Sequence, residues 1–189
     1  MICMTSEPLP EMANFGEKIV RAGLTTSRFG NISILSGNLI FITKTGSMLD
    51  ELDENQIIDV DLFGPCIHDA LASTETCVHR SIYLKSNANA IIHTHPPYSV
   101  VMSLLEDKCL TPKDSEGSHF LKEIPIVDGT FGTEKLAENV SFSLQNKRLC
   151  IVRGHGVFAI GENLREAYSI TCMSEHSAQI LYLLKVFDR

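Results

Sequence analysis

The sequence has no cysteine pair at the Cys-x-x-Cys spacing, no long apolar run and fewer basic than acidic residues. The six scattered cysteines exclude a disulfide framework or a thiolate zinc site, and favour reduced, small core residues. No segment approaches the roughly 20 apolar residues that a membrane-spanning helix needs. The first residues lack a basic segment followed by an apolar one, so no secretory signal is expected and a cytoplasmic protein is predicted.

The net charge of the chain indicates which classes of partner it can bind. Sixteen Lys and Arg residues stand against 23 Asp and Glu residues, a formal net charge of −7 at pH 7. Nucleic acid is therefore not expected as a partner, because its binding depends on cationic neutralisation of phosphates. A small anionic substrate stays compatible, since a few backbone amides can hold one phosphate. The 189 residues are 44% hydrophobic and 21% charged, which predicts one globular domain over 1–189.

Helical and strand patterns alternate along the chain without a linker. Helices are predicted over 7–22, 73–85 and 97–105 and from Thr133 and Asn163 onwards. Strands are predicted over 31–35, 39–43, 57–62, 88–94, 124–127, 149–153 and 156–160. The polar stretch 107–119 is predicted to be a mobile loop. Several strands are adjacent hairpin partners, which favours an α/β layered domain with a mixed or antiparallel sheet.

The strongest chemical feature is the segment 91–97, Ile-Ile-His-Thr-His-Pro-Pro. Side chains alternate between the two faces of a strand, so His93 and His95 project to the same side and could hold one metal ion. The two prolines end the strand and keep the pair at its rim. The alternative is two unrelated histidines at a strand end, each hydrogen-bonded to the backbone.

A third histidine, His155, lies between Gly154 and Gly156. Glycines allow a sharp turn and the close approach of another group. A third imidazole would complete a three-histidine site with an open position, which is typical of catalytic zinc, although imidazole also suits other divalent transition metals. The alternative is a tight hairpin with an exposed histidine.

The segment Ser73-Thr74-Glu75 is predicted to begin a helix. A Ser or Thr cap leaves the first helical N–H groups free to hold an anion. Glu75 stands 18 residues before His93, which leaves room for a helix and a return to the adjacent strand. Its carboxylate could then ligate the metal, exchange with substrate and act as a base. The alternative is an ordinary capped helix with a favourably placed acid in its first turn.

Two further turns, Gly30-Asn31 and Thr45-Gly46, could offer amides and a hydroxyl to a phosphate, although their residue types are also the commonest in turns. The other histidines have no partner at ligand spacing: His79 and His176 are interpreted as helix residues, and His68 and His119 as loop residues.

Taken in this order, the HTHP segment, the Ser-x-Glu helix start, the two turns and the final His-Gly resemble the class II aldolase/adducin family over about residues 23–182. The resemblance is strongest to its fuculose-phosphate aldolase-like branch. It implies an α/β fold of three layers, α/β/α, with a central mixed, largely antiparallel sheet. It also implies a homotetramer.

The resemblance assigns roles residue by residue. It implies metal ligation by His93, His95 and His155, and a role for Glu75 both as a metal ligand and as the acid or base. It implies phosphate binding by Gly30, Asn31, Thr45, Gly46, Ser73 and Thr74. The implied reaction is zinc-dependent cleavage of a short ketose 1-phosphate, similar to L-fuculose 1-phosphate, into dihydroxyacetone phosphate and an aldehyde. The implied intermediate is a metal-stabilised enediolate that Glu75 protonates.

Other activities of the same family are kept as alternatives. They are the dehydration of methylthioribulose 1-phosphate and the 4-epimerisation of ribulose 5-phosphate, although epimerases tend to carry Asp where Glu75 stands. A non-catalytic scaffold like the adducin head is disfavoured by the three retained histidines. The sequence departs from the family on the aldehyde side, where members often use a tyrosine shortly after HTHP. Only Tyr98 lies nearby, and among the loop residues Asp114, Glu116 and His119 are the polar groups that could substitute for it.

Overall fold

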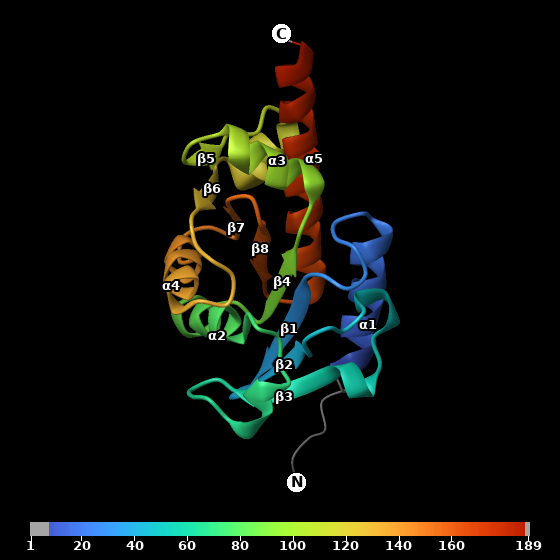
Figure 1. The fold of residues 1–189 in the computed structure, drawn as a ribbon. Helices are drawn as coiled ribbons and strands as arrows, with labels where there is room; N and C mark the ends of the chain where they lie inside the picture. Colours follow the sequence, from blue (N-terminus) through green and yellow to red (C-terminus); the bar gives the residue numbers. More distant parts are fainter. Residues whose placement is uncertain (1–7, 188–189) are drawn as a thin grey trace.

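The computed structural model describes residues 8–187, which form a three-layer α/β/α domain around one eight-stranded sheet (Figure 1). The order across the sheet is β3-β2-β1-β4-β8-β7-β6-β5. Neighbouring strands are antiparallel except β6 and β7, which are parallel. The predicted mixed, largely antiparallel sheet is thus confirmed. The strands are β1 (Asn31–Ser36), β2 (Leu39–Thr43), β3 (Ile57–Asp61), β4 (Ala90–Thr94), β5 (Cys109–Leu110), β6 (Ile124–Val127), β7 (Leu149–Val152) and β8 (Gly156–Gly161).

Helices cover both faces of the sheet (Figure 1). On one face, α2 (Thr76–Lys85) and α4 (Glu134–Ser143) pack together and bury Val78, Ile82 and Val140 against the strands. On the other face, α1 (Leu9–Arg21), α3 (Pro97–Leu105) and α5 (Leu164–Phe187) bury apolar side chains such as Met12 and Met102. Short helical turns connect these elements: η1 (Leu49–Glu51), η2 (Glu54–Gln56), η3 (Ile67–Ala70) and η4 (Gly117–Leu121).

The central strand β4 is buried along its whole length. Ile91 joins the core beneath α2 and α4, whereas Ala90 and Ile92 join the core beneath α1 and α5. This alternation is the expected strand period of two. It sends His93, which shares the parity of Ile91, toward the α2 and α4 face, where its ring stacks on Phe158 of the same core.

Most predicted strand and helix ends differ from the structure by one or two residues, and the start of α2 differs by three. Helix α2 begins at Thr76 and not at Ser73, because the preceding residues are bonded to the end of β2 instead. The Ser73 amide donates to the Thr43 carbonyl at 3.1 Å, and Lys44 and Ala72 form an antiparallel bridge. The strand predicted from residue 88 begins at Ala90.

The stretch 107–119, predicted as a loop, contains structure of its own. It holds β5, which pairs with β6, and the beginning of η4. The Asp114 carboxylate accepts from the Gly117 amide at 2.7 Å and so closes the turn before η4. The first residue of the predicted helix 7–22 and Cys3 lie outside the described residues.

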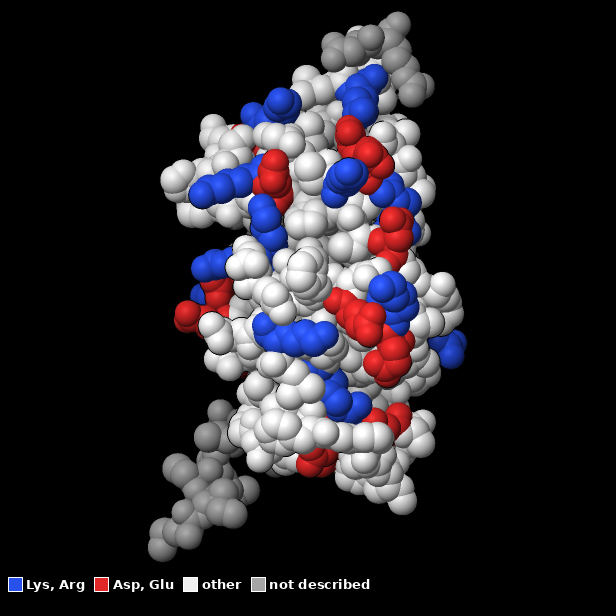
Figure 2. Space-filling model, turned by 90° about the vertical axis from the view of Figure 1, so that its left-hand side faces the viewer, with Lys and Arg blue, Asp and Glu red and all other residues white. Residues whose placement is uncertain are grey.

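Figure 2 shows the side of the molecule on which α2 and α4 lie, where basic and acidic side chains are interspersed. The ion pairs of the described residues include Lys135 with Glu138, both on α4, and Arg153 with Asp128. Within residues 8–187, no helix combines the length and the apolar character that crossing a bilayer would require. The described cysteines, Cys66, Cys77, Cys109, Cys150 and Cys172, are free.

Gly16 sets how closely α1 lies to η1. A Cβ at this position would come 1.9 Å from the carbonyl oxygen of Leu49. Alanine is the better helix former by roughly 1 kcal/mol, but the clash would force α1 away from η1. We expect Gly16→Ala to lower the free energy of unfolding by about 1–3 kcal/mol, measured by urea titration. The control Gly64→Ala, where a Cβ meets nothing within 4 Å, is expected to change it by less than about 0.5 kcal/mol. Unchanged stability of Gly16→Ala would contradict this packing.

Candidate active site

Three histidine side chains converge where the central strand ends. His93 and His95 come from the end of β4, and His155 comes from the turn between β7 and β8. Their candidate ligand nitrogens all lie within 4.8 Å of one another, and the Nε2 atoms of His93 and His95 are 3.0 Å apart. The structure therefore brings together the trio that the two sequence motifs predicted.

The ring of His93 is fixed on two sides. Its Nδ1 lies 2.9 Å from the Val157 carbonyl oxygen, which can only accept, so Nδ1 carries the proton. The ring also stacks on Phe158 with centroids 4.1 Å apart. A hydrogen bond at one imidazole nitrogen sets the tautomer and aims the other nitrogen, as metal-ligating histidines require. Nε2 of His93 is thereby directed at the histidine cluster.

Both glycines beside His155 are needed for this approach. A Cβ at Gly156 would lie 2.3 Å from the Thr94 carbonyl oxygen and 2.6 Å from Cδ2 of His95. Gly154 has a φ of +67°, which residues with a Cβ rarely adopt. The inference that these glycines admit a close neighbour is confirmed: Gly156 lies against Thr94 and the rings of His95 and His93, and Gly154 lies against the side chain of Leu104.

Glu75 completes the cluster from the turn before α2. Its side chain is buried, and its Oε2 lies 2.9 Å from Nε2 of His93 and accepts from Nδ2 of Asn31 at 3.1 Å. Burial raises the pKa of this carboxyl, but the charge and hydrogen bond of His93 and the hydrogen bond of Asn31 outweigh it and bring the pKa to about 2. Glu75 is therefore ionised near neutral pH and able to act as a ligand or a base.

The donor set fits a divalent metal ion. Because Nδ1 of His93 donates to the Val157 carbonyl oxygen, its Nε2 faces the centre of the cluster, 2.9 Å from Oε2 of Glu75 and 3.0 Å from Nε2 of His95. Oε1 of Glu75 and Nδ1 of His155 are buried without a hydrogen-bond partner. Burial lowers the pKa of His155, and burial with the neighbouring charges of His93 and His155 lowers that of His95 to about 3. Neutral imidazoles and an ionised carboxylate are what a metal ligand set needs.

A cleft of about 600 Å³ opens beside this cluster. It is lined by Glu75, His95 and His155, and by all six positions predicted for phosphate binding: Gly30, Asn31, Thr45, Gly46, Ser73 and Thr74. Gly30 and Gly46 both have positive φ, and a Cβ at Gly30 would lie 2.5 Å from the His93 carbonyl oxygen. The turns that the sequence singled out thus all line this cleft.

Sequence reasoning gave no role to five further residues that line the same cleft, namely Arg28, Phe29, Lys44, Ser47 and Phe131. Arg28 and Lys44 bring positive charge to it, and Phe29 and Phe131 bring apolar surface. The rings of the two phenylalanines are more than half exposed and lie 6.1 Å from His95 and 6.2 Å from His155, respectively. Arg28, Phe29 and Lys44 adjoin the glycine turns in sequence, which is the signal that could have found them.

His79, interpreted from the sequence as an ordinary helix residue, is part of a buried polar network. Its Nε2 lies 2.6 Å from Oδ1 of Asn31, and its Nδ1 lies 2.7 Å from Oγ of Ser33. The Tyr83 hydroxyl lies 2.7 Å from the same Oγ. Complete burial lowers the pKa of His79 to about 3, so the ring is neutral. The spacing of four between Glu75, His79 and Tyr83 shows that they share one side of a helix, but it does not show that Asn31 and Ser33 lie opposite them.

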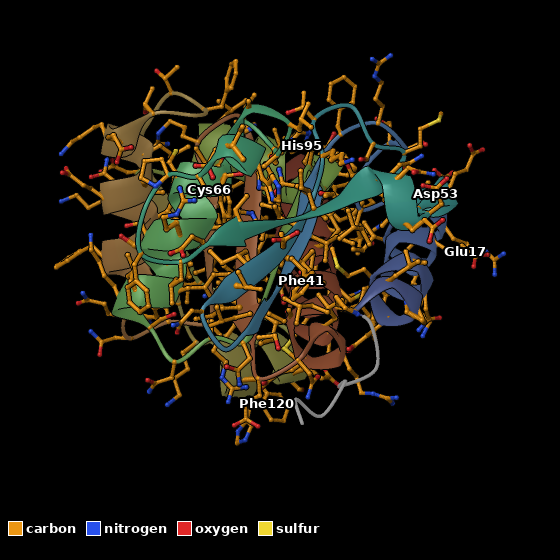
Figure 3. The ribbon with its side chains drawn as sticks, turned by 90° about the horizontal axis from the view of Figure 1, so that it is seen from below. Glu17, Phe41, Asp53, Cys66, His95 and Phe120 are labelled. Carbon is orange, nitrogen blue, oxygen red and sulfur yellow. The ribbon has the colours of Figure 1, made fainter. Side chains whose placement is uncertain are left out.

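The residues that the sequence offered in place of the family's tyrosine near the aldehyde do not line this cleft. His119 lines a separate cavity with Phe120 and Lys122. Figure 3 shows Phe120 well apart from His95. The Tyr98 ring packs beside Tyr182, with centroids 5.5 Å apart, in the core beneath α3 and α5. None of these side chains lines the cleft of its own chain.

Comparison with known proteins places this geometry in a family. The family described as Class II Aldolase and Adducin N-terminal domain matches residues 10–182. The L-fuculose phosphate aldolase of Methanococcus vannielii is 39% identical over 162 residues, which cover 85% of this chain and 87% of that protein. The L-fuculose phosphate aldolase of Escherichia coli is 29% identical over 88% of this chain and 78% of its own length.

A solved structure agrees over nearly the whole chain. The crystal structure of L-fuculose-1-phosphate aldolase from Thermus thermophilus has a TM-score of 0.91 and 34% identity, and the match covers 97% of both chains. The three matches together indicate an aldolase, that is, a lyase. The chain belongs to the class II aldolase and adducin family.

Proposed function

We propose that this protein is a metal-dependent aldolase that cleaves a short ketose 1-phosphate of the L-fuculose 1-phosphate type. The products are dihydroxyacetone phosphate and an aldehyde. One observation carries the proposal: an ionised Glu75 lies 2.9 Å from His93 of a three-histidine cluster, and Glu75, His95 and His155 line a cleft that also holds two cationic side chains. The names of the relatives above support this substrate type, and they do not favour dehydration or 4-epimerisation.

His93, His95 and His155 would hold the metal, with Glu75 as a further ligand that substrate can displace. Zinc is proposed because three nitrogen ligands with an open position are typical of catalytic zinc. The bound metal supplies a Lewis acid that polarises the substrate carbonyl. The buried position of His93 and its bond to Val157 keep its Nε2 aimed at the cluster throughout.

The phosphate group would bind at the wall of the cleft formed by Gly30-Asn31, Thr45-Gly46 and Ser73-Thr74. The amides of Thr45 and Ser73 already donate to the Leu71 and Thr43 carbonyl oxygens, so the amides of the neighbouring Gly46 and Thr74 would hold the anion, which glycine lets approach closely. Arg28 and Lys44 add positive charge to the same cleft. This anchoring would place the carbon chain of the substrate toward Glu75.

Glu75 moves the proton in this scheme. When the C3–C4 bond breaks, the C4 hydroxyl would lose its proton to the ionised carboxylate of Glu75 to give the aldehyde, and the electron pair stays on C3. The carboxyl of Glu75 then gives its proton to C3, which yields dihydroxyacetone phosphate. In the synthetic direction the ionised carboxylate removes that proton, and its low pKa of about 2 favours the ionised form in the free enzyme.

We also propose a cytoplasmic homotetramer. Large exposed apolar side chains near the ends of α3 and α5, among them Leu104 and Phe187, support contact with further copies of the chain. The free cysteines support a reducing compartment.

Removal of a histidine ligand should abolish stoichiometric metal. We expect purified wild-type protein to contain about one zinc ion per chain, and His93→Ala or His155→Ala a small fraction of that, because the remaining ligands no longer enclose the ion. Elemental analysis of dialysed protein measures this. The control His68→Ala changes a half-exposed histidine outside the cluster and should keep its metal. Full metal content in His93→Ala would contradict the assigned ligands.

Proton transfer by Glu75 can be measured without knowing the aldehyde. Zinc-loaded protein is incubated with dihydroxyacetone phosphate in heavy water, and NMR follows deuterium entry at the hydroxymethyl carbon. We expect stereospecific exchange in the wild type and a loss of about 100- to 10,000-fold in Glu75→Gln, the usual contribution of a general base. Glu138→Gln, an exposed change of the same chemistry, should exchange at the wild-type rate. Full exchange by Glu75→Gln would show that another group is the base.

The two cations of the cleft should act mainly on substrate binding. Loss of a charge-assisted hydrogen bond costs about 1.5–3 kcal/mol, so Arg28→Ala or Lys44→Ala should raise KM for the sugar phosphate roughly 10- to 100-fold. The inhibition constant of inorganic phosphate should rise in parallel. The control Lys18→Ala removes a cation from α1, outside the cleft, and should leave both constants unchanged. An unchanged KM in both cleft variants would place the phosphate elsewhere.

A further inference from the structure

Strand β1 and helix α2 bury polar side chains between them at matching intervals. Asn31 and Ser33 are two residues apart and therefore lie on one face of β1. Glu75, His79 and Tyr83 are four apart and therefore lie on one side of α2 and the turn before it. All five side chains are buried, Ser33 and His79 completely. The two periodicities bring them into one line that leads from the core to the metal cluster.

This line has one consistent assignment of protons. The Glu75 carboxylate can only accept, so Asn31 turns its Nδ2 toward it, and its Oδ1 consequently faces His79. Oδ1 also only accepts, so Nε2 of the neutral His79 ring carries the hydrogen. Nδ1 of that ring then accepts from the Ser33 hydroxyl.

The far end of the line follows from the same rule. The Ser33 hydroxyl has given its hydrogen to His79, so its oxygen accepts from the Tyr83 hydroxyl 2.7 Å away. Every hydrogen bond from Tyr83 to Glu75 thus points in the same direction. The resulting chain runs Tyr83, Ser33, His79, Asn31, Glu75.

The orientation of the Asn31 carboxamide needs a further argument. A carboxamide has nearly the same shape when its oxygen and nitrogen are exchanged, so packing alone does not choose between the two orientations. In the reversed orientation Oδ1 would face the Glu75 carboxylate, two acceptors 3.1 Å apart. The N–H of His79 favours the productive orientation, because it offers Oδ1 a donor 2.6 Å away on the opposite side.

We propose that His79 is a positioning residue that holds the Asn31 carboxamide in the orientation that donates to Glu75. The inference rests on the proposed role of Glu75 in proton transfer. Without the N–H group of His79, the Asn31 carboxamide can rotate by half a turn. The Glu75 carboxylate then loses the hydrogen bond from Nδ2 of Asn31 and faces its Oδ1, which repels it. Glu75 is no longer held beside His93 in a single position, so proton transfer slows although metal and substrate still bind.

The tautomer of His79 tests the inference without any measurement of activity. Long-range proton–nitrogen NMR spectra are recorded at neutral pH on protein labelled with ¹⁵N-histidine, both metal-free and zinc-loaded. The His79 signals are assigned by their loss in His79→Gln. The expected result in both forms is a neutral ring protonated at Nε2, with Nδ1 as a hydrogen-bond acceptor. A ring protonated at Nδ1, or at both nitrogens, would overturn the inference.

Variants separate positioning from simple packing. His79→Leu fills the space without a donor, whereas His79→Gln keeps an N–H group. In His79→Leu we expect kcat for deuterium exchange to fall about 10- to 100-fold, as is usual for groups that orient a metal site's ligands, with zinc content and KM little changed. His79→Gln should recover part of the loss. Tyr83→Phe, a matched control that removes only the distant hydroxyl, should have a smaller effect.

The outcomes remain distinguishable. Full turnover in folded His79→Leu would overturn the inference, since a purely structural role predicts lower stability with kcat unchanged. If His79→Leu fails to fold, Ser33→Ala replaces it, because that variant removes the donor to Nδ1. It should shift the tautomer equilibrium of His79 and reduce kcat together, and a shifted tautomer with unchanged kcat would overturn the inference. A wild-type protein without exchange would contradict the proposed function, while the tautomer would still decide the orientation of Asn31.

Discussion

The site depends on one constraint, the burial of a histidine inside the central strand of the sheet. His93 is fully buried between β1 and β8, where Asn31 and Phe158 are its register partners. An imidazole in such a place needs partners for both nitrogens. Val157 satisfies one nitrogen, and the other is left to the histidine cluster and Glu75. Each neighbouring strand therefore contributes directly to the chemistry: β8 fixes the ring, and β1 brings Asn31 to the carboxylate.

The same constraint explains why small residues surround the histidines. The backbone of the turn after β7 must pass within contact distance of the end of β4, and a Cβ at Gly156 would strike both Thr94 and His95. On the other side of β4, a Cβ at Gly30 would strike the His93 carbonyl oxygen. Close packing of backbone against backbone replaces side-chain packing here, which keeps the imidazoles at a fixed separation.

The sequence was most informative where a function has a local signature. The two-residue spacing of His93 and His95 on an apolar strand predicts that both side chains lie on one face. The glycines around His155 likewise predict a tight turn with room for a close neighbour. The start of α2 was predicted wrongly because the local capping rule competes with a tertiary contact: the Ser73 amide is bonded to Thr43, thirty residues earlier in the chain. The role of His79 could not be predicted, because four-residue spacings are frequent in helices and do not say which strand residue stands opposite. Pairing across such a sequence separation is visible only in the fold.

The bonds between the end of β2 and the turn before α2 have a consequence for ligand capture. Thr45 donates to the Ala72 carbonyl oxygen at 2.8 Å, and the Thr45 amide donates to the Leu71 carbonyl oxygen at 3.2 Å. Two segments from different parts of the chain are thereby joined before any anion arrives. A ligand that binds there has little loop motion to suppress, so most of the conformational entropy of binding has already been lost during folding. In the proposed function this part of the cleft would be a preorganised receptor for the phosphate, and its affinity should respond more to the charge of the ligand than to the flexibility of the protein.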